Sequence, residues 1–207
     1  VLFRSPGATN YMYKVVGNVY TTFDGITFQA DGAATVARYF WLTNVGTTNY
    51  TRDLVFQNCT FNGVNTSLSG PDNYLFMTDA GHITDGLYFT SNRFNFGDVH
   101  MWLDGGYGPS GSTNTNIVKN TLTDFYSRGV FMRNLQLPTV TGNTMTTLSV
   151  NPTPVTALDV ELNAAGGKYI GNKISFNRTG TGIRFASNSN VGSPAEITNN
   201  MVRVGNG

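Results

Sequence analysis

The hexapeptide VTGNTM, Val140 to Met145, places an asparagine between two apolar residues, three positions after the first and two before the second. The template apolar-x-x-Asn-x-apolar recurs as FTSNRF (89–94), IVKNTL (117–122), YIGNKI (169–174) and ITNNMV (197–202), and two earlier segments carry Ile26 or Cys59 at its centre. All fourteen flanking positions are apolar in a chain that is 40% apolar, which chance does not explain. The seven centres, 26, 59, 92, 120, 143, 172 and 200, lie 23 to 33 residues apart, so one structural unit repeats along the chain.

Each repeat reads as short strands joined by a sharp bend. The residue before the centre is mostly a turn former: Gly25, Asn58, Ser91, Lys119, Gly142, Gly171 or Asn199. A further strand follows each bend: YFWLT (39–43), YLFMT (74–78), VHMWL (99–103), GVFMR (129–133), ALDVEL (157–162) and GIRFA (182–186). Gly or Pro interrupts every window long enough to show helical periodicity, so no helix is predicted.

Units of this size cannot bury an apolar face alone, but stacked units share one continuous core. The sequence therefore predicts an all-β parallel solenoid of about six to seven coils, with like positions of successive coils about 4.8 Å apart. We expect each central asparagine to adopt left-handed backbone and to hydrogen-bond to the next one in an asparagine ladder. The predicted ladder residues are Cys59, Asn92, Asn120, Asn143, Asn172 and Asn200. Cys59 is interpreted as a small buried hydrophobe rather than a nucleophile.

Composition excludes several classes of function. The 207 residues carry a net charge of +1 and only 12% charged residues, which excludes the basic surface of a nucleic-acid-binding protein. Thr, Asn and Gly together supply 76 residues, a balance that suits strands and tight turns. A single cysteine rules out a disulfide framework and a zinc set, and no apolar run is long enough to span a membrane.

The two ends of the sequence suggest a piece of a larger protein. Residues 1–5, VLFRS, end in the translation of a common sequencing-adapter tail, and we predict that they are not native; a genuine strand end is the alternative. Residues 6–207 are then one β-solenoid domain, truncated at both ends. We expect a monomer that further coils or domains continue.

Over residues 11–207 the chain resembles the right-handed parallel β-helix proteins of the pectin-lyase-like fold. The segments YTTFDGITF (20–28), VFQNCTFNG (55–63), YIGNKISFNRTGTGIRF (169–185) and AEITNNMV (195–202) resemble repeats of Bacteroidetes-type surface proteins. The resemblance implies a right-handed β-helix that is secreted or attached to the cell surface, often through type IX secretion. Its members include polysaccharide lyases, hydrolases, epimerases and non-catalytic adhesins, so the fold alone does not select an activity.

Enzymes with this fold use the outward residues of the strand that follows the bend and its loop. Strand alternation predicts two outward columns here. One contains Trp41, Phe76, His100, Phe131, Asp159 and Arg184, and the other contains Thr43, Thr78, Trp102, Arg133, Glu161 and Ala186. Exposed aromatic residues on a stiff sheet can bind sugar rings, so we predict substrate binding by Trp41, Phe76, Trp102, Phe131 and Arg184. The alternative is that loops 62–73 and 105–115 cover these side chains as part of a core.

The charged residues of the columns have two interpretations. In the catalytic one, His100 is the general base and acts with Arg133, Asp159 and Glu161, and the two carboxylates are possible calcium ligands. In the structural one, opposite charges in adjacent coils only pair with each other. His82, in DAGHITDG, is expected to be an exposed turn residue.

We therefore expect a β-helix segment that binds polysaccharide or a surface glycan without a complete active site. A polysaccharide lyase or glycoside hydrolase acting on a uronic-acid polymer is the first alternative. A passive stalk or adhesin is the second. No cofactor other than calcium is implied.

Overall fold

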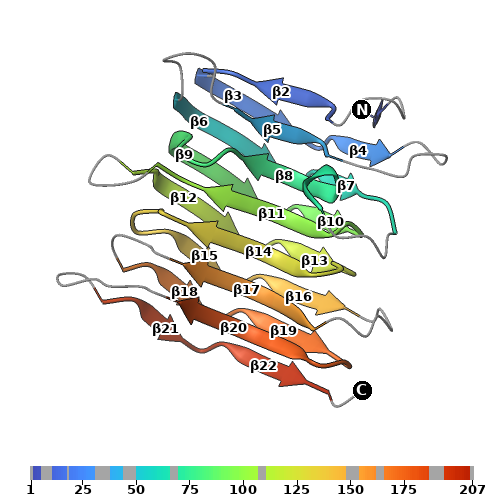
Figure 1. The fold of residues 1–207 in the computed structure, drawn as a ribbon, viewed down its shortest axis with the longest axis vertical. Coiled ribbons are helices and arrows are strands. Elements are labelled where there is room, and N and C mark those ends of the chain that lie inside the picture. The colour runs from blue at the N-terminus through green and yellow to red at the C-terminus, as the bar shows by residue number, and fades with distance from the viewer. Residues whose placement is uncertain are drawn as a thin grey trace.

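The computed structural model describes residues 2–5, 11–17, 19–30, 38–43, 50–65, 70–106, 111–147, 154–161, 166–186 and 194–205. Within these ranges the chain forms 22 strands and one short 3-10 turn, Pro71–Asn73. The strands lie in three parallel sheets, one of eight strands and two of seven, stacked along one axis (Figure 1). The protein is a right-handed parallel β-helix of about seven coils, which confirms the predicted fold.

We name the three sheets A, B and C. Sheet A contains β1 (Leu2–Ser5), β4 (Thr27–Ala30), β7 (Thr60–Asn62), β10 (Arg93–Asn95), β13 (Thr121–Thr123), β16 (Thr144–Thr147), β19 (Lys173–Phe176) and β22 (Met201–Val204). Sheet B contains β2 (Tyr13–Val15), β5 (Phe40–Leu42), β8 (Tyr74–Thr78), β11 (Val99–Asp104), β14 (Arg128–Arg133), β17 (Val155–Glu161) and β20 (Gly180–Ala186). Sheet C contains β3 (Val19–Asp24), β6 (Tyr50–Gln57), β9 (Ile83–Thr90), β12 (Thr113–Val118), β15 (Thr139–Thr141), β18 (Lys168–Ile170) and β21 (Glu196–Thr198).

The bend between sheets C and A is a two-residue corner. The residue before each ladder position has a positive φ, between 54° and 65°: Gly25, Asn58, Ser91, Lys119, Gly142, Gly171 and Asn199. The ladder asparagines have no such φ, so the expectation that they are left-handed was wrong. The backbone turns one residue earlier, and this leaves the asparagine side chain directed into the stack.

The asparagine ladder runs through the buried corner. The Asn143 amide nitrogen Nδ2 donates to the Ile117 carbonyl at 2.8 Å and to Asn172 Oδ1 at 2.9 Å. Asn143 Oδ1 accepts from the Asn120 backbone N–H at 2.8 Å and from Asn120 Nδ2 at 3.1 Å. The same contacts link Asn92 to Asn120 and Asn172 to Asn200. Each asparagine thus satisfies a backbone donor of the coil before it, as buried polar groups require.

Cys59 ends the ladder. Its backbone N–H donates to Asn92 Oδ1 at 2.9 Å, and its buried Sγ lies 3.4 Å from the Phe23 carbonyl, the position that an amide nitrogen takes in the later coils. The predicted buried position of Cys59 is confirmed.

We expect Cys59→Asn to raise the free energy of unfolding by about 1–2 kcal/mol, because the new amide would donate to Phe23 and accept from the Ile26 backbone N–H, at about 1 kcal/mol per hydrogen bond. Urea denaturation at pH 7 measures the change. A variant less stable than the parent would show that the corner is too tight for a sixth polar rung.

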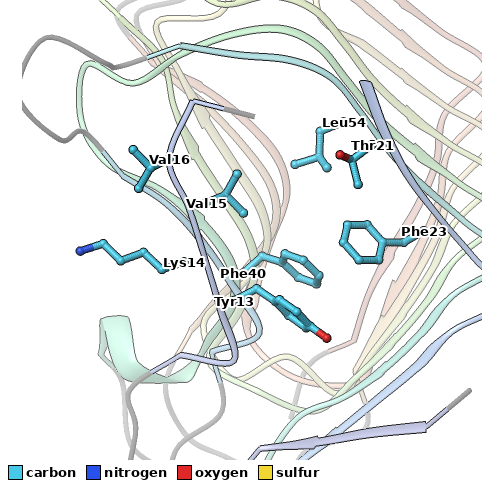
Figure 2. A pocket seen from close by; sticks show the side chains of 8 residues that line it. All are labelled: Tyr13, Lys14, Val15, Val16, Thr21, Phe23, Phe40 and Leu54. Atoms are coloured by element: carbon cyan, nitrogen blue, oxygen red, sulfur yellow. The ribbon is translucent and has the colours of Figure 1, made fainter. Parts of the chain in front are cut away.

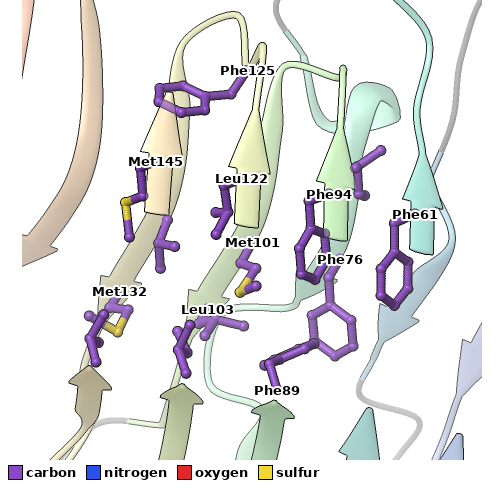
Figure 3. Close-up of a cluster of buried hydrophobic side chains, with 14 of the residues drawn as sticks. Phe61, Phe76, Phe89, Phe94, Met101, Leu103, Leu122, Phe125, Met132 and Met145 are labelled. Atoms are coloured by element: carbon purple, nitrogen blue, oxygen red, sulfur yellow. The ribbon is translucent and has the colours of Figure 1, made fainter. Parts of the chain in front are cut away.

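Aromatic stacks fill the core of the N-terminal coils. Phe56 and Phe89 stack at 5.3 Å between ring centroids, Phe61 and Phe94 at 4.5 Å, and Phe40 and Phe76 at 6.0 Å. Figure 3 shows Phe76, Phe89 and Phe94 directed into the same interior as Met101 and Leu103. In the later coils, Leu122 and Met145 take the positions of Phe61 and Phe94 in sheet A. The solenoid therefore has one continuous apolar core.

The N-terminal end of the core has a hollow of about 240 Å³. Tyr13, Val15, Phe23, Phe40 and Leu54 line it, and their side chains converge in Figure 2 while Lys14 points away.

β1 is the first strand of sheet A and pairs with β4 from Leu2↔Thr27 to Ser5↔Ala30. The origin of residues 1–5 stays a prediction.

Candidate functional site

The outward face of sheet B carries the predicted columns in a corrected order. Strand pairing sets Trp41 beside Met77, then Trp102, Phe131, Asp159 and Arg184 in one column. A second column contains Asp104, Arg133, Glu161 and Ala186. Trp102 therefore belongs with Trp41 and Phe131, and not with Arg133 as alternation from the sequence predicted.

Three predicted outward residues lie inside the coils: Phe76, His100 and Thr78, which is aligned with the core residue Leu42 and is 3% exposed. Phe76 and His100 are completely buried, so their prediction as surface residues was wrong. In β8, Leu75 and Phe76 are both buried, which interrupts the alternation, and His100 lies opposite Leu75 in the next coil. The corner with sheet A takes up this additional inward residue. A prediction that alternates strictly between inward and outward residues cannot include two consecutive inward residues.

His100 is surrounded by aromatic rings. Its ring lies 5.9 Å from Phe94 and 5.6 Å from Phe125 between centroids. Burial lowers the pKa of His100 to about 3, an effect that the backbone of Phe96 offsets only in part. The structure therefore does not bring His100 together with Arg133, Asp159 and Glu161, which lie on the outer surface of sheet B.

The aromatic residues of sheet B stack on one another along the solenoid axis. Tyr74 and Trp102 stack at 5.1 Å and 17°, and Trp102 and Phe131 at 4.0 Å and 25°. The guanidinium of Arg128 lies 5.8 Å from the Trp102 ring and 5.7 Å from the Phe131 ring. Phe131 is buried by this packing, while Trp102 keeps part of its surface exposed. The faces of Trp102 are thus occupied, and its edge is the part left for a ligand.

Trp41 is enclosed in a similar way. Its Nε1 donates to Asp79 Oδ1 at 2.6 Å, and Tyr11 lies against it at 5.4 Å. Lys14 Nζ and the Arg38 guanidinium lie 4.9 Å and 5.3 Å from the ring centroid. Cations over an indole ring stabilise its position. The described part of sheet B therefore has no row of aromatic rings with exposed faces, which the sequence had predicted for sugar binding.

Buried carboxylates hold the arginines of this face. Asp159 accepts from Arg128 Nε at 2.9 Å and from Arg184 Nε at 2.7 Å, and Arg184 also binds Glu161. Hydrogen bonding to Asp159 is the main cause that raises the pKa of Arg184. Arg133 binds Asp104 through two nitrogens, although Glu161 is its neighbour in the register.

Asp104 and Arg128 were not predicted. Asp104 directly follows the segment VHMWL, and Arg128 directly precedes GVFMR. Both would have been included if the full lengths of the two strands had been predicted.

These contacts agree with the structural interpretation of the charges. Asp159 and Asp104 are buried and paired, and Glu161 is paired with Arg184. Among the described residues, no three His, Cys, Asp or Glu side chains gather closely enough to hold a metal ion. Calcium binding and the catalytic roles stay predictions. The predicted covering loops include residues 66–69 and 107–110, which lie outside the described ranges.

The fold and this face define a right-handed parallel β-helix with an asparagine ladder and with paired arginines on the outer face of sheet B. No protein-family model, curated protein or solved structure shows a significant match to the chain. In the part of the chain that the structure describes, no helix has the length and apolar character needed to cross a membrane.

Proposed function

We propose that the chain is a segment of a secreted or cell-surface β-helix protein, of the Bacteroidetes type that its repeats resemble, and that sheet B binds polysaccharide without altering it. One observation carries the proposal. Arg128, Arg133 and Arg184 keep 34%, 28% and 39% of their side chains exposed while buried or half-buried carboxylates fix their orientation.

Fixed guanidinium groups suit a polymer with many hydroxyl oxygens. Each guanidinium has five N–H donors in a planar arrangement, and the donors on its exposed side can bind hydroxyl groups. Little side-chain entropy is lost on binding, because the ion pairs already order the arginines. The exposed edge of Trp102 adds apolar contact beside Arg128.

The paired carboxylates favour binding over catalysis. A general acid or base must exchange its proton with the substrate, whereas Asp159 is buried between two arginines. A passive stalk or adhesin is the second candidate. It is favoured by the closed stacking of Tyr74, Trp102 and Phe131, which also serves a purely structural role.

The test is affinity electrophoresis through gels that contain neutral or uronic polysaccharides. We expect Trp102→Leu and Arg184→Gln to lose at least about 1 kcal/mol of binding, a roughly fivefold weaker retention, since aromatic and charge-assisted contacts are each of this size. Arg93→Gln, an exposed arginine of sheet A, is the matched control.

Three results would contradict this function. Unretarded migration of the parent protein in every gel would favour the stalk. Retention that neither sheet B variant changes would place binding elsewhere. New reducing or unsaturated sugar ends after incubation, with or without calcium, would indicate a hydrolase or a lyase.

A further inference from the structure

Sheet C carries a column of left-handed residues in four successive coils. Tyr20, Asp53, Gly86 and Asn114 have φ values of 55°, 48°, 88° and 54°. Strand pairing aligns them, because Val19 and Thr21 pair with Arg52 and Leu54, and the same offset continues into β9 and β12. Each of the four strands therefore has a left-handed residue at the same level, and these residues form a ridge along sheet C.

The conformation of Tyr20 is energetically unfavourable. A bulky residue in left-handed backbone costs about 1–3 kcal/mol, and such residues cluster at binding and catalytic sites. Gly86 shows that the column is also closely packed, since a Cβ there would lie 2.5 Å from Asp53 Oδ1. The side chain of Asp53 thus occupies the space beside Gly86.

Tyr20 presents its ring to solvent. It is 71% exposed, the highest value among the large apolar side chains of the described residues. This distinguishes it from Trp102, whose ring faces are covered by Tyr74 and Phe131. An exposed aromatic face on a stiff backbone is suited to stacking against a flat, partly apolar ligand.

A polar network lies next to this ring, because the Tyr20 side chain hydrogen-bonds to Arg52. Arg52 donates to the Tyr50 hydroxyl from Nε at 3.3 Å and from Nη2 at 3.0 Å, and Tyr50 donates to Asp85 Oδ2 at 3.0 Å. Asn114 Nδ2 donates to Asp85 Oδ1 at 2.8 Å. Hydrogen bonds from Asn114, Thr113 and Tyr50 lower the pKa of Asp85, so it is ionised at neutral pH.

We propose that Tyr20, Tyr50, Arg52, Asp53, Asp85 and Asn114 form a second binding site, for a neutral saccharide. The Tyr20 ring stacks on the apolar face of a sugar, and the Arg52 guanidinium and the Asp53 carboxylate bind its hydroxyl groups. Arg52 contributes one positive charge and the two aspartates one negative charge each, so the site has a net charge of −1. This charge disfavours uronates and sulfated sugars.

The site is independent of the face in the proposed function. It lies on sheet C, whereas Trp102 and Arg184 lie on sheet B, and no residue is shared. Either face can therefore bind when the other does not, and variants of each separate the two.

Isothermal titration with oligosaccharides of neutral β-glucan, mannan and xylan, and with oligogalacturonate, tests the proposal. We expect the protein to bind at least one neutral oligosaccharide, and Tyr20→Asn to weaken this binding about tenfold or more, which corresponds to about 1.4 kcal/mol. Asparagine tolerates left-handed backbone, and Asn114 already has it in this column, so the variant should fold normally.

Leu137→Asn is the matched control, because Leu137 also has left-handed backbone, with φ 47°, and is 60% exposed. Leu137→Asn should leave binding of the neutral oligosaccharide unchanged. No binding to any neutral oligosaccharide, or equal binding by Tyr20→Asn, would overturn the proposal. Binding of oligogalacturonate alone, lost in Trp102→Leu, would support the sheet B face and overturn this one.

Discussion

Replacing Asn143 by alanine is expected to lower the free energy of unfolding by about 4–6 kcal/mol, since each buried polar group left without a partner costs about 1–3 kcal/mol. The substitution removes the acceptor of two Asn120 donors and the donor to the Ile117 carbonyl, all in a corner that water does not reach. Small domains are stable by about 5–15 kcal/mol in total, so the variant should be largely unfolded under mild denaturant.

Urea denaturation followed by circular dichroism measures this loss. Asn116→Ala is the matched control, because the Asn116 amide donates to the nearby Asn114 carbonyl on the exposed side of sheet C. That control should change the stability by less than about 0.5 kcal/mol. A loss below about 1 kcal/mol in Asn143→Ala would mean that the ladder contributes little to the fold.

Acid is expected to destabilise the protein well above the pH at which its carboxylates titrate. Both histidines are buried; His82 was predicted to be exposed, but it lies in the interior 2.9 Å from the Thr51 hydroxyl. Burial lowers the pKa of His82 to about 4 and that of His100 to about 3. In the unfolded chain both side chains have a pKa of about 6.5.

The unfolded chain therefore binds more protons than the folded one between these values. Stability from the neutral histidines is fully present above about pH 6.5 and is lost as the pH falls toward 4. At pH 5 each histidine should cost about 2 kcal/mol, or about 4 kcal/mol together. The effect is large because neither ring can become charged in place without exposing the core.

His100→Leu separates this effect from the titration of the carboxylates. Leu75 occupies the matching position in the preceding coil, so a leucine fits the corner, and stability at pH 7 should be kept. The variant should lose about 2 kcal/mol less than the parent between pH 7 and pH 5. Urea midpoints measured at both pH values provide the comparison. Equal losses in parent and variant would show that His100 is protonated in the folded protein.

The fold could be predicted because its signal is local and repeated. The spacing of Phe89, Asn92 and Phe94 recurs in every later coil, and each copy indicates the same corner between two short strands. The ladder followed from the same pattern, since asparagines at like positions of successive coils lie within hydrogen-bonding distance of one another. One local detail was wrong, because the left-handed residue, such as Ser91, precedes the asparagine.

The outer face was predicted only in part. Arg133, Asp159, Glu161 and Arg184 lie on sheet B as expected, and Asp159 pairs with Arg184. The error at His100 arose where two consecutive residues point inward at the corner with sheet A. Such a shift depends on how the coils fill the corner, for which the sequence of one strand carries no signal.

The repeat, the parallel β-helix and the asparagine ladder could be predicted from the amino-acid sequence, because they depend on residue types that recur at similar spacing. Which side chains reach the surface became evident from the packing of the coils. It places His100 in the core, covers both faces of Trp102 with its neighbours in the stack, and leaves the ring of Tyr20 exposed on a strained ridge of sheet C. Exposure depends on contacts between residues of neighbouring coils, which are far apart in the sequence: Asn120 and Asn143 are separated by 23 positions, and Cys59 and Phe23 by 36.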